Sequence, residues 1–176
     1  MSVCDVDEDI ITLAASSVIQ LLDQNPDLKP TDIGRIYVGT ESSIDGSKPI
    51  GTYVHGLVQQ YFDSKGKDTT GINHIDVVDM TFACIGAVDA VHNSLYYLYA
   101  NPDKVAIVVA ADIANYDLDS PGEYTQGAGA IAVLLSKNPS LMSISDKWGV
   151  SVKNEHDFFN PIRYHKVNGE IQAIHD

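Results

Sequence analysis

The run His74-Ile75-Asp76-Val77-Val78-Asp79-Met80-Thr81-Phe82-Ala83 ends on Cys84, and residues 85–95 follow with the apolar spacing of a helix. This pattern predicts a strand that turns directly into a helix. Cys84 would then lie at the helix N-terminus, where unpaired N–H groups and the helix dipole favour a thiolate. The position suits a nucleophile, although Cys84 taken alone fits a small buried core cysteine equally well.

Composition limits the class of protein. The chain has 176 residues, 44% of them hydrophobic, which is enough for one domain or one half of a larger one. Its 11 basic and 24 acidic residues argue against nucleic acid and anionic membranes as partners. No apolar run approaches the roughly 18 residues of a membrane span, and the N-terminus is acidic, so we expect a cytoplasmic protein. Cys4 is the only other cysteine, so neither a disulfide framework nor a zinc or other metal site is predicted.

The order of the elements predicts an α/β fold. Helical spacing covers residues 10–22, 50–62 and the segment after Cys84, and strand patterns cover 35–40, 74–83, 105–111 and 127–136. The last two strand patterns are apolar on both faces, as in strands covered by helices on both sides. We therefore predict a mixed sheet with helices on its faces.

Polar side chains stand at the ends of three predicted strands. These are Glu41, Cys84 and Asp112. Because functional residues of open α/β sheets collect at the carboxyl ends of strands, we expect all three at one edge. After Asp112 the chain passes through Tyr116 and the segment Thr125-Gln126-Gly127-Ala128-Gly129-Ala130 into the last predicted strand.

Several segments resemble the 3-hydroxy-3-methylglutaryl-CoA (HMG-CoA) synthases, condensing enzymes of the thiolase superfamily. They are Val38-Gly39-Thr40-Glu41-Ser42-Ser43-Ile44-Asp45-Gly46-Ser47-Lys48, Phe82-Ala83-Cys84-Ile85-Gly86-Ala87, Ala110-Ala111-Asp112-Ile113-Ala114-Asn115-Tyr116, the Thr125 segment, Asp157-Phe158-Phe159-Asn160-Pro161 and Val167-Asn168-Gly169-Glu170. The resemblance runs from about Asp7 onward. It implies a thiolase-like N-terminal half-domain over residues 1–176, with a mixed, five-stranded type of sheet covered by helices.

The resemblance also implies an acyltransferase without a cofactor, whose substrates are acetyl-CoA and acetoacetyl-CoA. Cys84 would take the acetyl group as a thioester, and Glu41 would act as general base or acid at the acetyl methyl group during carbon–carbon bond formation. Water would then release HMG-CoA. Backbone N–H groups of Cys84 and of Gly127-Ala128-Gly129 would stabilise the oxyanion. The implied substrate-binding residues are Asp112, Tyr116, Thr125, Gly127 and Asp157.

Each role has a plainer alternative. Glu41 could end a strand or cap the next helix. Asp112 and Tyr116 could be ordinary loop residues, Asp157 could support the site from outside it, and Thr125 could simply start a strand. Gly127 could allow close backbone packing, since the glycines here precede a strand and do not form a dinucleotide-binding motif.

The chain also departs from the family pattern. Family members carry a catalytic histidine and an acceptor-binding asparagine in a second half of the fold, and none of the six histidines lies in a matching segment. We therefore expect a chain that is incomplete at both ends and that acts as a homodimer or with a polypeptide supplying the second half. A noncatalytic scaffold and a related ketoacyl synthase stay open as alternatives. Isoprenoid supply through the mevalonate pathway and polyketide β-branching also both stay open.

Overall fold

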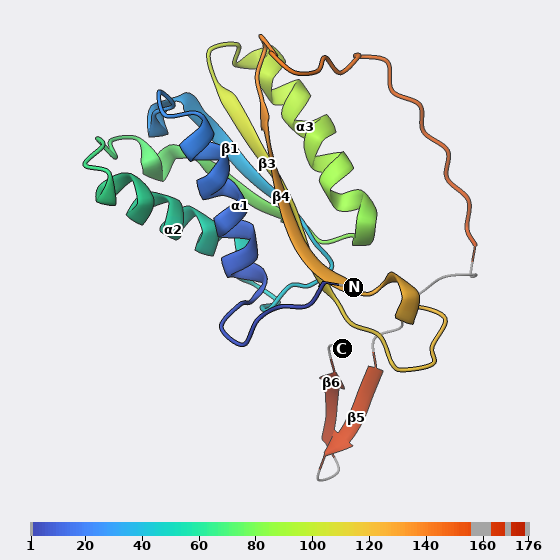
Figure 1. The fold of residues 1–176 in the computed structure, drawn as a ribbon. Helices are drawn as coiled ribbons and strands as arrows, with labels where there is room; N and C mark the ends of the chain where they lie inside the picture. The colour runs from blue at the N-terminus through green and yellow to red at the C-terminus, as the bar shows by residue number, and fades with distance from the viewer. Residues whose placement is uncertain (1, 156–162, 168–169, 175–176) are drawn as a thin grey trace. The chain divides into compact units, whose positions relative to one another are not determined.

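The computed structural model describes residues 2–155 and the backbone of residues 163–167 and 170–174. The chain forms two compact units, Met1–Ser140 and Leu141–Asp176. The first contains a sheet and three long helices (Figure 1). In the second, β5 (Arg163–Val167) and β6 (Glu170–Ile174) pair antiparallel. Among the described residues, no helix has the length and apolar character needed to cross a bilayer.

The first unit alternates helices and strands, which confirms the predicted α/β class. Its elements are α1 (Ile10–Gln24), β1 (Ile33–Gly39), α2 (Ile50–Ser64), β2 (Asp76–Met80), α3 (Gly86–Ala100), β3 (Val105–Ala114) and β4 (Gly127–Leu135). β2 is shorter than predicted, because 3-10 turns at Ile72–His74 and Ala83–Ile85 take up its two ends. β3 is longer than predicted, because it pairs with β4 as far as Ala114.

The sheet is mixed, as predicted, with the strand order β2-β1-β3-β4. β2, β1 and β3 are parallel, and β4 is antiparallel to β3. Within the described residues this sheet has four strands, so the five-stranded type implied by the resemblance is corrected. Among the described residues at the start of the chain, Ser2 bonds to β4: its carbonyl accepts from Ala128 N at 3.0 Å, and its hydroxyl donates to Ala128 O at 2.6 Å. Two bonds at one residue do not make a strand.

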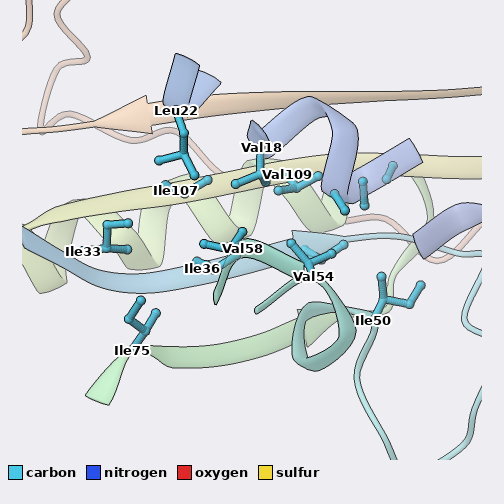
Figure 2. Packing of buried hydrophobic residues seen from close by; sticks show 14 of the residues in the cluster. Val18, Leu22, Ile33, Ile36, Ile50, Val54, Val58, Ile75, Ile107 and Val109 are labelled. Atoms are coloured by element: carbon cyan, nitrogen blue, oxygen red, sulfur yellow. The ribbon is translucent and has the colours of Figure 1, made fainter. Parts of the chain in front are cut away.

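Helices cover both faces of the central strands. α1 and α2 lie on one face and α3 on the other (Figure 1). Since side chains alternate along a strand, Ile36, Ile107 and Val109 face α1 and α2, where Figure 2 shows them with Val18, Leu22, Val54 and Val58. Tyr37, Ala106 and Val108 instead pack with Ala90 and Leu98 of α3. This arrangement confirms the prediction that helices cover both faces of β3.

We predicted that helices would cover both faces of β4, and this prediction was wrong for one face. Its residues Ala130, Ala132 and Leu134 pack against the α1 side of the core. Ile131 and Val133, which alternate with them, are 61% and 40% exposed. α3 lies over β1, β2 and β3 and leaves this face of β4 largely uncovered.

Close backbone contacts fix the start of α3 against the sheet. A Cβ on Gly86 would lie 2.4 Å from the Met80 carbonyl oxygen, and one on Gly39 would lie 2.2 Å from Ala87 N. Real Cβ atoms do not approach backbone so closely, so neither position has room for a side chain. The missing Cβ atoms let α3 begin directly on the carboxyl ends of β1 and β2, and this sets the position of the turn that carries Cys84.

We expect Gly86→Ala to lower the free energy of unfolding by about 1–3 kcal/mol, because the added methyl group must push α3 away from Met80. Gly56→Ala is the matched control. Gly56 lies inside α2, and an added methyl group there would meet nothing within 4 Å, so alanine should stabilise the helix by about 0.5–1 kcal/mol. Urea unfolding of both variants measures the difference. Equal stabilities would contradict the close approach at Gly86.

Candidate functional site

The candidate site lies where three parallel strands end side by side. Gly39, the last residue of β1, is in register with Met80 of β2 and with Ala110 of β3. Just beyond the ladder, Thr40 N donates to Met80 O at 3.2 Å. The segments that carry Glu41, Cys84 and Asp112 therefore leave one edge of the sheet together, as expected. Asp112 lies within β3 rather than after it.

Cys84 lies in the 3-10 turn Ala83–Ile85, two residues before the first residue of α3. Its side chain is exposed, so the alternative of a buried core cysteine is wrong. Ala83 has a φ of 34°, in the left-handed region that alanine rarely adopts. Gly86 N closes the turn by donating to Phe82 O at 2.9 Å. The chain therefore reverses sharply just before Cys84 and presents its sulfur at the surface.

Glu41 lies on the loop between β1 and α2, and aspartates from two other strands fix the ends of this loop. At the start, Asp112 Oδ1 accepts hydrogen bonds from Glu41 N at 2.6 Å, Thr40 Oγ1 at 3.0 Å and Ser42 Oγ at 3.2 Å. At the far end, Asp79 of β2 accepts from Ile50 N at 2.5 Å and from Gly51 N at 2.9 Å. The alternative of Glu41 as a helix cap is therefore wrong, because Asp79 caps α2.

Thr40 and Ser42 were not among the residues predicted from the sequence. Both hydroxyls bond to Asp112, and Thr40 is completely buried. The available signal was a hydroxyl residue on each side of Glu41 directly after an apolar strand. That signal is weak on its own, because serine and threonine are common after strands for reasons of turn geometry.

Electrostatic effects link the side chains at this edge. Although Glu41 is exposed as a residue, partial burial of its carboxyl group raises its pKa, and the charge of Asp112 raises it further. Burial is the largest effect on the pKa of Tyr116 and raises it, and the negative charge of Glu41 raises it as well. A side-chain hydrogen bond with Thr125 lowers this pKa. Weaker contributions from Cys84 and Asp112 also raise the pKa of Tyr116. The phenol of Tyr116 therefore lies within electrostatic range of Glu41, Cys84 and Asp112.

The loop between β3 and β4 holds Tyr116 in place. A Cβ on Gly122 would lie 2.6 Å from the Tyr116 ring, so the ring packs directly on the Gly122 backbone. Tyr116 N donates to Gln126 Oε1 at 3.2 Å, and Thr125 Oγ1 donates to Gly122 O at 2.7 Å. Thr125 lies in the 3-10 turn Glu123–Thr125 and does not start the strand, because β4 begins at Gly127.

Two predicted residues remain, Gly127 and Asp157. Gly127 pairs with Ala114 in the ladder between β3 and β4. Ala128 N donates to Ser2 O, so this N–H is not free for an oxyanion. For the N–H groups of Gly127 and Gly129 the oxyanion role stays a prediction. Asp157 lies outside the described residues. In the described part of the chain, no cluster of three or more His, Cys, Asp or Glu side chains could hold a metal ion.

This arrangement can support acyl transfer with proton abstraction. An exposed cysteine on a sharp turn can attack a carbonyl carbon and later release the acyl group. A carboxylate whose pKa is raised is a stronger base than an ordinary glutamate and accepts a proton more readily. A phenol whose pKa is raised stays protonated and can donate a hydrogen bond.

The chain is similar to proteins of one family. The family model "Hydroxymethylglutaryl-coenzyme A synthase N terminal" matches residues 1–140. The chain is 38% identical over 159 residues to a hydroxymethylglutaryl-CoA synthase of Haloferax volcanii, covering 89% of this chain and 34% of the relative. It is 34% identical over 176 residues to the cytoplasmic synthase of Gallus gallus, covering 97% of this chain and 32% of the relative.

Solved structures give the same result. A structure of MvaS in complex with 3-hydroxy-3-methylglutaryl coenzyme A superposes with a TM-score of 0.64 at 37% identity, over 78% of this chain and 30% of that one. An HMG-CoA synthase complexed with CoA superposes with a TM-score of 0.61 at 34% identity, over 78% of this chain and 32% of that one. The chain spans about a third of the length of these relatives. Over the N-terminal region of its thiolase-type fold, it belongs to the hydroxymethylglutaryl-CoA synthase family.

Proposed function

We propose that this chain carries the acyl-loading site of an HMG-CoA synthase that condenses acetyl-CoA with acetoacetyl-CoA through an acetyl-Cys84 thioester. The observation that carries the proposal is the grouping of Cys84, Glu41, Asp112 and Tyr116 at one sheet edge, with Cys84 exposed on a sharp turn. Two related structures are described as complexes with HMG-CoA and with CoA, which supports acyl-CoA substrates.

The proposed reaction begins at Cys84. Its thiolate attacks the carbonyl carbon of acetyl-CoA, and the CoA thiolate leaves, so that the acetyl group is held as a thioester. Glu41 removes a proton from the acetyl methyl group, and the resulting carbanion attacks the ketone carbon of acetoacetyl-CoA. The C=O double bond of the ketone opens to an alkoxide, which takes the proton back from the Glu41 carboxyl group and becomes the hydroxyl of the product. Water then cleaves the thioester to Cys84. The phenol of Tyr116 would donate a hydrogen bond where negative charge develops.

We further propose that a complementary second half of the fold, or a second copy of the chain, covers an apolar surface of the first unit. Val88, Tyr96 and Tyr99 are exposed on α3, and Ile131 and Val133 are exposed on β4. An apolar surface of this kind usually marks an interaction site. The same surface would suit the alternative function of a noncatalytic partner-binding scaffold. A scaffold alone gives no reason for the arrangement around Cys84 and Glu41.

We propose a cytoplasmic location and a role in isoprenoid supply through the mevalonate pathway. The location is supported by the name of the Gallus gallus relative, which is described as cytoplasmic. The proposed product supports this pathway, because HMG-CoA is the compound that it consumes, and polyketide β-branching stays the alternative.

Incubation with acetyl-CoA followed by intact-mass analysis tests the acyl-loading step. We expect the chain to gain one acetyl group, and Cys84→Ser to lower the rate of loading by about 100-fold or more, because a neutral hydroxyl group is a much weaker nucleophile than a thiolate. Cys4→Ser is the matched control and should load like the wild type. Undiminished acetylation of the Cys84→Ser variant would overturn the proposal.

A further inference from the structure

We propose that Thr40 and Ser42 are positioning residues that hold Glu41 beside the Cys84 turn by fastening the chain after β1 to Asp112 and Ile113 of β3. We call this set of hydrogen bonds the Asp112 latch. The proposal rests on the proposed role of Glu41 and deepens it, because it explains how a glutamate on a loop keeps a fixed position.

The latch begins where the backbone ladder stops. β1 pairs with β3 only as far as Gly39 and Ala110. Beyond that point β3 continues to Ala114 by pairing with β4, so β1 no longer supplies partners to it. The residues that follow Gly39 must therefore be held by side chains or move with the loop.

Two hydroxyl groups take over this task. Thr40 Oγ1 donates to Asp112 Oδ1 at 3.0 Å and accepts from Ser42 N at 3.0 Å. Ser42 Oγ donates to Asp112 Oδ1 at 3.2 Å and accepts from Ile113 N at 2.9 Å. Each hydroxyl group both donates and accepts a hydrogen bond, so these bonds connect the residues after β1 to β3 in one network.

Glu41 is held between these two residues through its backbone. Its N–H donates to the same Asp112 oxygen at 2.6 Å, a short bond to a charged acceptor. Thr40 is completely buried, so this side of the latch is shielded from water. With both neighbours fixed, the side chain of Glu41 leaves the backbone in one direction. Misplacement of a reacting group by about 1 Å can cost roughly 100-fold in rate.

The pKa of Glu41 provides a readout that does not depend on catalysis. The charged and titratable groups that interact with Glu41 are Asp112 from β3 and Tyr116 from the loop after β3. Cys84, from the turn before α3, acts on the pKa of Tyr116. Burial and the charge of Asp112 raise the pKa of Glu41. If the latch opens, the carboxyl group moves into water and away from Asp112, and its pKa must fall toward the ordinary value.

The test is a carboxyl-carbon NMR titration of the 176-residue chain, with the Glu41 signal assigned by its loss in Glu41→Gln. We expect the pKa of Glu41 to fall in Ser42→Ala and further when Thr40→Val is added. Ser42→Thr keeps the hydroxyl and should restore the wild-type value. Ser43→Ala is the matched control, because Ser43 Oγ donates to Asp45 O in the same loop and does not contact Asp112. A wild-type pKa of Glu41 in folded Ser42→Ala would overturn the proposal, and isosteric Thr40→Val alone repeats the test if Ser42→Ala unfolds.

A second readout separates positioning from a general loss of structure. In Ser42→Ala, deuterium exchange at the acetyl methyl group should slow by about 10-fold or more, while acetyl loading of Cys84 stays unchanged. An equal loss of both would indicate a merely structural role and overturn the proposal. Failure of the wild type to load acetyl would refute the proposed function instead, and the NMR titration would still decide whether the latch exists.

Discussion

Replacing Glu41 with glutamine should slow deuterium exchange at the methyl group of acetyl-Cys84 by about 100-fold or more, because the amide cannot accept the proton. Acetyl loading of Cys84 should change little, since that step depends on the thiolate. The measurement is mass analysis of the acetyl group after incubation with acetyl-CoA in heavy water. The pKa of Glu41 is raised by burial and by Asp112, so the rate of exchange should rise with pH through a higher range than for an ordinary glutamate.

Glu8→Gln is the control for this prediction. Glu8 accepts a hydrogen bond from Asp5 N near the N-terminus and belongs to none of the contacts at the site. Its variant should exchange at the wild-type rate. Exchange in Glu41→Gln that remains within a few-fold of the wild type would remove Glu41 from the proposed mechanism and leave Tyr116 or Asp112 as the group to test.

Phe62→Ala should lower the free energy of unfolding by about 3–5 kcal/mol, because it removes a large, completely buried side chain and leaves a cavity. Phe62 lies in α2 and packs in the core between α1, α2 and the sheet. Domains of this size are stable by only about 5–15 kcal/mol, so the variant should be partly unfolded under mild conditions. Urea unfolding followed by circular dichroism measures the change.

Phe82→Ala is the matched control for Phe62→Ala. Phe82 is 69% exposed, so its removal should change the free energy of unfolding by about 0.5 kcal/mol or less. If the two variants lost similar stability, the core would not be centred on the contacts between the helices and the sheet. A large effect at Phe82 alone would instead mean that the exposed apolar residues near Cys84 are covered in solution.

The apolar patterns of the sequence determined most of the fold. The run 105–111 is apolar on both faces, and β3 lies between two layers of helices as predicted. Residues at the carboxyl ends of neighbouring parallel strands lie at one edge of the sheet, because the strands end side by side. This reasoning is enough to place Glu41 and the Cys84 turn at the same edge.

Other features depended on contacts between residues far apart in the chain. The α3 side of β4 is uncovered because α3 lies over the other three strands, and no local pattern shows that. Asp112 bonds to residues about 70 positions away, so its hold on the Glu41 loop could not be derived from its own neighbours. The sequence alone thus determined which residues reach the edge, since burial depends on local apolar periodicity. Only the tertiary structure decided which side chains bond to each other, because hydrogen-bond partners and pKa shifts depend on distances that the folded chain sets.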